Sequence, residues 1–491
     1  MGPPRARRIA VIGGGISGLA AAHRLRTLFG ASAEITVLER SGRLGGVLLT
    51  IDLAGVPYDV GAEAFLVRRP ELTALLAELG LAAVHPSGAA ATVRAGGRTV
   101  PLPAATLLGV PTTRARLAGV LSTAGLAAVA AEPGRPLRWA AGGDVALGRL
   151  LRARFGDELA DRLVDPLLGG VYAGRVDALG LRATLPALAA ALDAGAPSLT
   201  AAADAALGPA SRGERTRESG RNGTRVGAEG QPPVFGALPG GYRVLLDALA
   251  DGASAEVRLH TTAVGLERGP DGWRLLLGAA ARESLDVDAV LLAVPAPALA
   301  RLLAAVAPVA ARAAAGIELA SSVVVALAYQ AADAVSLPGT SGTLVAADEP
   351  LAVKGVTHSS RKWAHLAPEA TDGLVRLRAS LGRFGEAASL QADDAELARR
   401  VRADLAVLAG ITAEPLAVHV QRWGGGLPQY AVGHLDRARA VEEGLPSGLA
   451  VAGAALRGVG VPACVGTARA AAERLAASLA VPPVHPDSAR A

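Results

Sequence analysis

The chain has 491 residues, more than one hydrophobic core usually supports, so we expect two or more structural lobes. Hydrophobic residues make up 51% of the sequence and aromatic residues 3%, and the single cysteine excludes an internal disulfide and suits a reducing compartment. The net charge of +5 is a weak signal for nucleic-acid binding and equally suits an acidic small-molecule substrate.

The N-terminal segment has the order of elements that binds a dinucleotide. Ile9–Ile12 is a short apolar run typical of a buried strand, and Gly13, Gly15 and Gly18 follow it in G-x-G-x-x-G spacing. The first glycine allows a tight turn, the second a close approach to a pyrophosphate, and the third close packing of a helix on the strand. The segment therefore predicts a Rossmann-type unit.

The residues after this loop complete the predicted unit. A helix over 16–28 would direct its N-terminal amides at the pyrophosphate. A second strand, Glu34–Leu38, is followed by Glu39, whose carboxylate can accept hydrogen bonds from ribose hydroxyls. The alternative is a secretory signal peptide, since arginines precede the apolar stretch, but the glycines interrupt the apolar core that such a signal requires.

The next glycine-rich segment indicates which dinucleotide is bound. Arg43 can neutralise phosphate charge, and Gly45 and Gly46 let the chain run close to a cofactor, although Gly42–Gly46 alone would be taken as a surface turn. The segment resembles the Arg-x-Gly-Gly turn of a flavoprotein superfamily that includes amine oxidases, phytoene desaturases and protoporphyrinogen oxidases. This resemblance implies FAD rather than a nicotinamide cofactor.

Several later segments narrow the resemblance further. In order they are Asp59–Pro70, Leu238–Tyr242, Thr357–Trp363, Arg422-Trp423 with Pro428–Tyr430, and Gly458–Cys464. With these segments the chain resembles the porphyrinogen oxidase branch of that superfamily, which includes protoporphyrinogen and coproporphyrinogen III oxidases, from about Arg8 to Leu475. The implied fold is α/β, with a discontinuous Rossmann-type FAD-binding domain, a mixed-sheet substrate domain and an α-helical lobe.

Carried over residue by residue, the resemblance implies FAD contacts spread along the chain. Gly61–Ala64 would present backbone amides to the isoalloxazine, and Val264, at the end of a predicted strand, would contact adenine. Gly458–Gly460 precedes a predicted helix over 467–479, whose N-terminus would stabilise negative charge on reduced flavin. Without the resemblance, Val264 and Val461 would be taken as core residues. The implied contacts are Gly13, Gly14, Gly15, Ile16, Ser17, Gly18, Glu39, Arg40, Val47, Gly61, Ala62, Glu63, Ala64, Val264, Trp423, Val459, Gly460 and Val461.

The predicted domains are not contiguous, because strand and helix patterns of the flavin domain recur late in the chain. We expect an FAD-binding domain from 1–75, 238–300 and 446–480, a helical lobe at 100–207, and a substrate domain from 76–99 and 301–445. An arginine-rich polar stretch at 208–233 is typical of a disordered insertion rather than a nucleic-acid site, and 481–491 is a tail.

The middle of the chain predicts both helices and strands. Asp157–Pro166 has the 3.6-residue spacing of an amphipathic helix, while Ser321–Gln330, Leu374–Leu381 and Val418–Arg422 read as strands of a sheet that roofs the flavin. The longest weakly polar stretch, Leu117–Ala131, is shorter than a membrane span requires. We expect no transmembrane segment, and shallow peripheral attachment to a membrane is the alternative.

Neither cysteine nor histidine chemistry is predicted. Cys464 lies in an apolar context, which favours a packed thiol over a nucleophile or a covalent flavin anchor. The eight histidines form no H-E-x-x-H pattern and the chain has no C-x-x-C pattern, so no metal site is expected.

The resemblance implies a reaction that needs no catalytic side chain. A porphyrinogen is poised to aromatise, so the enzyme need only hold a meso carbon against flavin N5 and accept a hydride. Three such steps give the porphyrin, and O2 would reoxidise the flavin to yield H2O2. An apolar cavity would hold the macrocycle and basic residues its propionates. Candidates for the latter are Arg68, Arg69, Lys354, Arg361 and Lys362, although a solvated surface position is the commoner role of any single one.

We favour the four-propionate substrate, coproporphyrinogen III, over protoporphyrinogen IX for two reasons. The bias toward alanine, arginine and glycine suggests a bacterial source with a GC-rich genome, and the sequence shows no membrane segment. The alternatives are an amine oxidase, which would need more aromatic residues beside the flavin, a carotenoid desaturase, which would need a long apolar tunnel, and a non-catalytic flavin-fold partner protein. We expect a cytoplasmic enzyme of haem biosynthesis, with a porphyrinogen and O2 as small-molecule partners and a ferrochelatase as the candidate protein partner.

Overall fold

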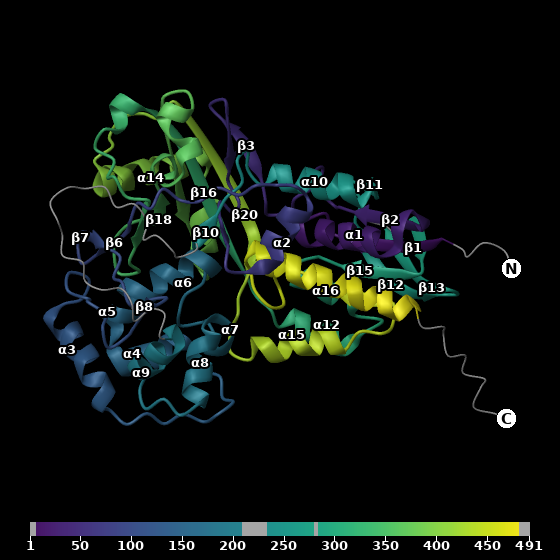
Figure 1. Ribbon diagram of the computed structural model, residues 1–491, viewed down its shortest axis with the longest axis horizontal. Coiled ribbons are helices and arrows are strands. Elements are labelled where there is room, and N and C mark those ends of the chain that lie inside the picture. The colour runs from purple at the N-terminus through teal and green to yellow at the C-terminus, as the bar shows by residue number, and fades with distance from the viewer. Residues whose placement is uncertain (1–5, 209–232, 279–282, 481–491) are drawn as a thin grey trace.

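The computed structural model describes residues 6–208, 233–278 and 283–480. Figure 1 shows a domain built on a parallel sheet at one end, and a second sheet with a lobe of helices at the other. The stretch expected to be disordered, 208–233, and the tail at 481–491 lie outside the described residues, except for residues 208 and 233.

Five parallel strands from three separate parts of the chain form the first sheet. Their order is β11-β2-β1-β15-β21, so the first strand of the chain lies at the centre. The predicted strands over 9–12 and 34–38 are confirmed, each with bounds one or two residues wider. The strands are β1 (Arg7–Ile12), β2 (Ala33–Leu38), β11 (Glu256–Arg258), β15 (Ala289–Leu292) and β21 (Leu449–Val451).

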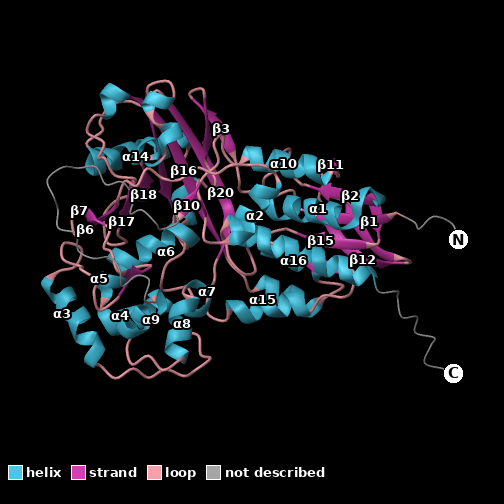
Figure 2. Ribbon diagram, in the orientation of Figure 1, coloured by secondary structure: helices cyan, strands magenta, loops and turns pink. Residues whose placement is uncertain are grey.

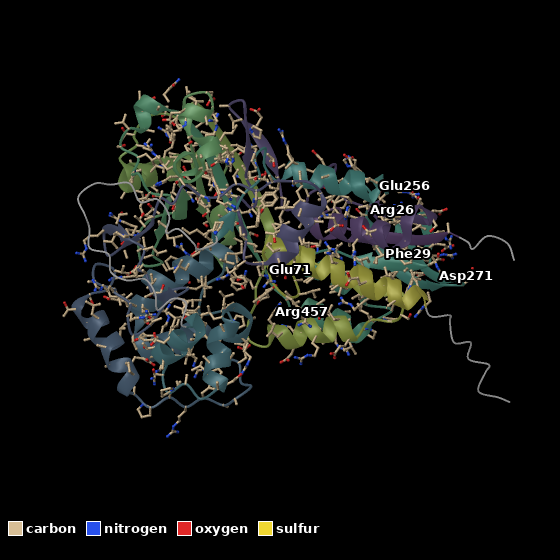
Figure 3. The ribbon with its side chains drawn as sticks, viewed as in Figure 1. Arg26, Phe29, Glu71, Glu256, Asp271 and Arg457 are labelled. Carbon is tan, nitrogen blue, oxygen red and sulfur yellow. The ribbon has the colours of Figure 1, made fainter. Side chains whose placement is uncertain are left out.

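Helices cover one face of this sheet. Helix α1 (Ile16–Phe29) packs between α10 (Arg243–Ala253) and α16 (Val461–Ala480), and alanines on α1 and α16 allow the helices to approach closely. At the C-terminal end of α1, Arg26, labelled in Figure 3, donates to the carbonyls of Gly30, Ala33, Ala253 and Ser254. This guanidinium therefore joins α1 to β2 and α10.

A small antiparallel sheet and two helices cover the other face. The sheet has the order β12-β13-β14, and its Trp273 packs under β15 in one apolar cluster with α11 and α12. The prediction that a strand ends at Val264 is wrong, because β12 begins at Ala263 and the chain turns just before it. These elements are β12 (Ala263–Gly269), β13 (Gly272–Leu277), β14 (Glu283–Val287), α11 (Ala296–Leu303) and α12 (Pro308–Ala315).

The second large sheet has seven strands in the order β20-β16-β19-β18-β17-β6-β7, visible as the magenta strands beside α14 in Figure 2. All neighbours are antiparallel except β17 and β6. Helix α14 (Asp394–Ala409) buries Leu397, Val401 and Leu405 against one face. The strands are β6 (Ala91–Ala95), β7 (Arg98–Pro101), β16 (Leu319–Gln330), β17 (Gly342–Val345), β18 (Val353–Thr357), β19 (Leu374–Leu381) and β20 (Ala417–Pro428).

The helical lobe packs against the other face of that sheet. The helix predicted over 157–166 continues to Tyr172 through a π-helical turn at 160–164, because Pro166 cannot donate the regular hydrogen bond. Across the described ranges, no helix is long and apolar enough to span a membrane. The helices are α3 (Thr123–Ala131), α4 (Leu147–Phe155), α5 (Asp157–Leu159), α6 (Asp165–Tyr172), α7 (Leu181–Thr184), α8 (Pro186–Asp193) and α9 (Leu199–Leu207).

Short elements connect these layers. Two hairpins and a two-stranded ladder lie between the larger units, and short helices precede or follow the strands of the second sheet. They are β3 (Thr50–Leu53) with β4 (Val56–Asp59), β8 (Thr106–Leu107) with β9 (Val110–Pro111), β5 (Phe65–Leu66) with β10 (Phe235–Gly236), and α2 (Pro70–Glu78), α13 (Ser359–Lys362) and α15 (His434–Glu443).

Candidate active site

The first glycine loop has the geometry that its spacing predicts. Gly13 has φ +104°, and a Cβ on Gly18 would lie 1.8 Å from the Gly13 carbonyl oxygen, so packing of α1 on β1 requires both glycines. A Cβ on Gly15 would meet nothing closer than Gly46, at 3.8 Å. The packing of the protein therefore does not require a glycine at position 15. A glycine there keeps the space at the N-terminus of α1 open, and a bound pyrophosphate needs that space.

Glu39 is held in place at the end of β2. Its two carboxylate oxygens accept hydrogen bonds from the backbone N–H groups of Gly14 and Ser41, both at 2.8 Å. An ionised carboxylate has further lone pairs available, so these bonds orient Glu39 and leave it able to accept from ribose hydroxyls. Val264, expected to contact adenine, is 42% exposed at a β-bulge between Ala263 and Gly265.

The Arg-x-Gly-Gly turn is braced from within. Arg43 donates to the carbonyls of Leu44, Gly46 and Leu48, so its guanidinium stabilises the turn, and its contact with a phosphate stays a prediction. Burial lowers the pKa of Arg43. Arg40 is exposed, and Val47 is 45% exposed beside the same turn.

The loop Gly61–Ala64 connects the two sheets. A Cβ on Gly61 would lie 2.0 Å from the Val47 carbonyl oxygen, so the two segments touch through their backbones. Arg378 of β19 donates to the Gly61 carbonyl at 2.7 Å, and Trp423 Nε1 of β20 donates to the Val60 carbonyl at 2.9 Å. Two strands of the second sheet therefore fix the loop expected to face the isoalloxazine.

Glu63 in this loop is paired with the short helix α13. Lys362 Nζ lies 3.0 Å from one carboxylate oxygen, and Ser359 Oγ, which also bonds Tyr58 Oη, donates to the other at 2.8 Å. Burial acts to raise the pKa of Glu63, but attraction to Lys362 and Arg378 outweighs it and the pKa is lowered. Lys362, one of the propionate candidates, therefore holds a protein carboxylate.

The second glycine loop ends directly in a helix. The prediction that this helix begins at residue 467 is wrong: α16 begins at Val461, because the small Gly458–Gly460 run allows the chain to enter the helix at once. Val459 packs on the core of the helical lobe, and Gly460 is exposed. Cys464, in the first turn, is buried, and burial raises its pKa to about 11, as suits an unreactive packed thiol.

Tyr430 holds the second glycine loop in place, a role that the sequence did not predict. Its hydroxyl donates to the Ala454 carbonyl at 2.7 Å and accepts from the Gly458 N–H at 2.6 Å, so it clamps both ends of the loop before α16. His434 stacks on its ring at 3.6 Å, and burial lowers the pKa of His434 to about 4. The resemblance pointed to the Pro428–Tyr430 segment, but the sequence did not show that Tyr430 contacts Ala454 and Gly458.

Replacing Tyr430 by phenylalanine is expected to destabilise this loop without changing the shape of the core. The change removes both hydrogen bonds and leaves the Ala454 carbonyl and the Gly458 N–H without that partner, at a cost of about 1–3 kcal/mol. We expect faster FAD release, measured by flavin fluorescence after dilution. Tyr329→Phe is the matched control, since the buried Tyr329 hydroxyl has no partner among the described residues; equal FAD release from both variants would contradict the clamp.

The candidates for propionate binding separate into two groups. Arg68, Arg69 and Arg361 are exposed, and Arg69 lies 3.3 Å from Glu71. Lys354 is only 8% exposed and donates to the Gly382 carbonyl. The structure therefore leaves the arginines at the surface and directs Lys354 inward.

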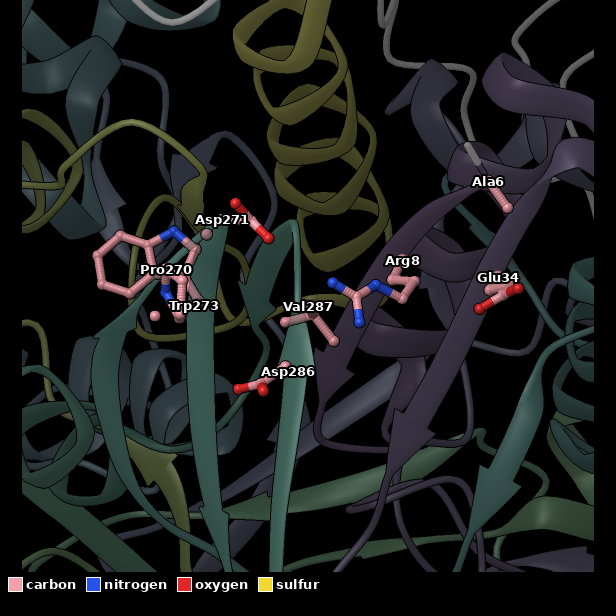
Figure 4. Close-up of a pocket in the computed structure, with 10 residues that line it drawn as sticks. Ala6, Arg8, Glu34, Pro270, Asp271, Trp273, Asp286 and Val287 are labelled. Carbon is pink, nitrogen blue, oxygen red and sulfur yellow. The ribbon is translucent and has the colours of Figure 1, made fainter. Parts of the chain in front are cut away.

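A separate cleft of about 440 Å³ lies at the opposite end of the parallel sheet from the glycine loops. Arg8 and Glu34, at the starts of β1 and β2, line it together with Trp273 and Asp286 (Figure 4). Ligands of open parallel sheets bind beyond the carboxyl ends of the strands. This cleft is at the amino ends and does not belong to the candidate active site.

Comparisons with known proteins agree with this arrangement. The model of the family "Flavin containing amine oxidoreductase" matches residues 16–476. The chain is 46% identical to a coproporphyrinogen III oxidase of Mycobacterium tuberculosis, covering 94% of this chain and 96% of the relative, and 44% identical to that of Mycobacterium leprae, covering 96% and 99%.

A solved structure has the same fold. The crystal structure of a putative protoporphyrinogen oxidase from Exiguobacterium sp. 255-15 superposes with a TM-score of 0.80 at 30% identity, covering 96% of this chain and 99% of that one. Together with the open glycine loop at the start of α1 and the fixed loop Gly61–Ala64, these similarities identify the cofactor as FAD. The chain belongs to the flavin containing amine oxidoreductase family and, within it, to the branch of the coproporphyrinogen III oxidases.

Proposed function

We propose that this protein oxidises coproporphyrinogen III to coproporphyrin III in haem biosynthesis. The observation that carries the proposal is the similarity to coproporphyrinogen III oxidases along nearly the whole chain, with both glycine loops retained. The reaction removes six electrons and six protons from the substrate in three steps, and three O2 become three H2O2. The metal-free porphyrin product is the substrate type of a ferrochelatase, which makes such an enzyme the candidate partner.

The residues of this chain hold the reactants and shield the site. When bound, FAD supplies a two-electron acceptor for the hydrogen lost from a substrate carbon. The N-termini of α1 and α16 provide amides and positive dipole ends at the two glycine loops. Arg378 and Trp423 keep the Gly61–Ala64 loop in one position, so the substrate sheet and the cofactor loop keep a fixed relation. No side chain is assigned as a base, since pyrrole nitrogens and solvent can take the protons.

The test is oxidation by the purified flavoprotein of coproporphyrinogen III and of protoporphyrinogen IX, followed by porphyrin fluorescence and by H2O2 release. We expect three H2O2 per porphyrin and a higher kcat/KM for coproporphyrinogen III. Cyclohexylamine and putrescine serve as control substrates, because amine oxidases share the fold at 17–18% identity. Turnover of an amine, with neither porphyrinogen oxidised, would overturn the proposal.

A further inference from the structure

Lysine is used at only two positions in this chain. Of 49 basic residues, 47 are arginine, and the lysines are Lys354 and Lys362. An ammonium group is a compact point charge with three donors, whereas a guanidinium is a planar fork that is always charged. Both lysines lie in the second sheet or in α13 beside it. Lys362 is paired with Glu63, so the role of Lys354 is the one left unexplained.

A β-bulge directs Lys354 out of the regular strand pattern. Val353 pairs with Leu381, but the next pair is Gly355 with Ser380, so Lys354 is the extra residue on β18. Val353 and Leu381 face the α14 core, whereas Lys354 Nζ reaches the Gly382 carbonyl at 2.9 Å. Bulges occur next to active sites because they re-aim a side chain. Helix α6 lies against β18 (Figure 1), and its Asp165 is among the charged groups that act on the Lys354 ammonium.

The Lys354 ammonium has no carboxylate partner among the described residues. Among the described residues, the Gly382 carbonyl is the acceptor for its three donors, and no carboxylate lies within 4.0 Å. Arg383, also 8% exposed, has a long ion pair with Asp165 Oδ2 of α6 at 3.7 Å, and its guanidinium donates to the Val345 carbonyl at 3.4 Å. Burial first, and then repulsion from Arg383, lowers the pKa of Lys354 to about 8.

The acidic groups nearby are already engaged or misplaced. Glu386 accepts from the Arg383 backbone N–H and pairs with Arg175. Asp165 Oδ1 accepts from the Val176 N–H, while its buried Oδ2 has no hydrogen-bond partner among the described residues. A buried ammonium with two donors to spare is costly and calls for an acceptor, which is the role of Lys354 that the protein's own groups leave open. Asp165 Oδ2 calls for a donor, and the nearby Arg383 guanidinium lies 3.7 Å from it.

We propose that Lys354 and Arg383 form the binding site for one propionate carboxylate of the tetrapyrrole. This rests on the proposed function and names a residue pair that would select the substrate. A carboxylate can accept from the two remaining donors of Lys354 and from the Arg383 guanidinium, in charge-assisted hydrogen bonds. Arg383 follows the end of β19, and the same strand carries Arg378, which pairs with Thr357 of β18 and whose guanidinium contacts the Gly61 loop. A vinyl group at this position would leave the Lys354 ammonium without a carboxylate partner.

The first test measures binding of coproporphyrin III, which cannot be turned over, to the holoenzyme by fluorescence quenching. Lys354→Met should weaken binding about tenfold to a hundredfold, the value of hydrogen bonds to a charged group. The tetramethyl ester of coproporphyrin III should bind the variant and the wild type alike. Arg439→Met, which removes one exposed charge of α15, is the control and should leave binding unchanged. Unchanged affinity of Lys354→Met for the free acid would overturn the proposal.

The second test uses the wild-type protein, so it does not depend on how a variant folds. Lysine labelled with ¹³C at Cε gives two side-chain signals, one for each lysine. Bound coproporphyrin III should raise the pKa of Lys354, whereas the tetramethyl ester should not. The charged groups that face this ammonium are Arg378, Arg383, Glu386 and Asp165, and all are present in both measurements. A Lys354 signal that titrates alike with and without the acid would overturn the proposal.

The two proposals fail in different ways. If the wild-type flavoprotein neither oxidises porphyrinogens nor binds coproporphyrin III, the proposed function is wrong. If it does both and Lys354→Met behaves as wild type, only the carboxylate site is wrong.

Discussion

Replacing Gly18 by alanine should give a protein that does not retain FAD through purification. The new Cβ would lie 1.8 Å from the Gly13 carbonyl oxygen and 3.3 Å from a methyl group of Val11, so α1 must move away from β1. Overpacking costs about 1–3 kcal/mol, and about 1.4 kcal/mol is a tenfold change in affinity. We therefore expect FAD affinity to fall about 10- to 100-fold, measured by titrating apoprotein with FAD.

The matched control for this variant is Gly134→Ala. Gly134 is exposed, and a Cβ there would meet no atom within 4 Å. Its FAD content should equal that of the wild type. Full flavin occupancy in Gly18→Ala, with an unchanged affinity, would show that the first loop does not need close packing of α1 on β1.

Replacing Glu132 by alanine should strongly destabilise the helical lobe. Its side chain is fully buried and accepts from Arg154, from the N–H groups of Leu199 and Thr200, and from Thr200 Oγ1. It therefore pairs a buried guanidinium and also caps the start of α9. Removing one partner of a buried ion pair costs about 3–5 kcal/mol. Urea unfolding followed by circular dichroism would measure this loss.

The same carboxylate makes the lobe sensitive to acid. Burial acts to raise the pKa of Glu132, but hydrogen bonds from Thr200, Leu199 and Arg154 outweigh it and lower the pKa. Its contribution is therefore complete above the ordinary carboxyl pKa and is lost as the pH falls through the lowered value. Glu132→Ala should lack this part of the acid dependence, whereas Asp436→Ala, which alters a surface pair, should keep it. Equal stability of both variants would refute the role of Glu132.

The sequence was enough to predict those helices and strands whose formation depends on residues close together in the chain. The β1–α1–β2 unit follows from apolar periodicity and three glycines. β19 has the bounds of its predicted strand, Leu374–Leu381, because apolar and polar residues alternate along it with the two-residue period of a strand. The π turn before Pro166 was missed because it changes the helix register without changing the apolar pattern.

Long-range contacts decided what the sequence could not. In the sequence, Arg68, Arg69 and Lys354 are equally good candidates for binding a propionate. Only the bulge on β18 and the packing of α6 against that strand distinguish the buried lysine from the exposed arginines. Arg43 was expected at a phosphate, yet it donates to three carbonyls of its own turn. Tyr430 acts on residues more than twenty positions away, which no sequence spacing reveals.

The strand order of the parallel sheet also sets when the protein can acquire its flavin during synthesis. β1 lies between β2 and β15, and the Arg8 N–H bonds Asp288, 280 residues further along, while β21 closes the sheet from residue 449. On the ribosome, β1 therefore waits with one edge unpaired for most of translation, and such edges recruit wrong partners. A nascent chain cut short before β21 is a client for chaperones and proteases, and flavin loading becomes one of the last events in its biogenesis.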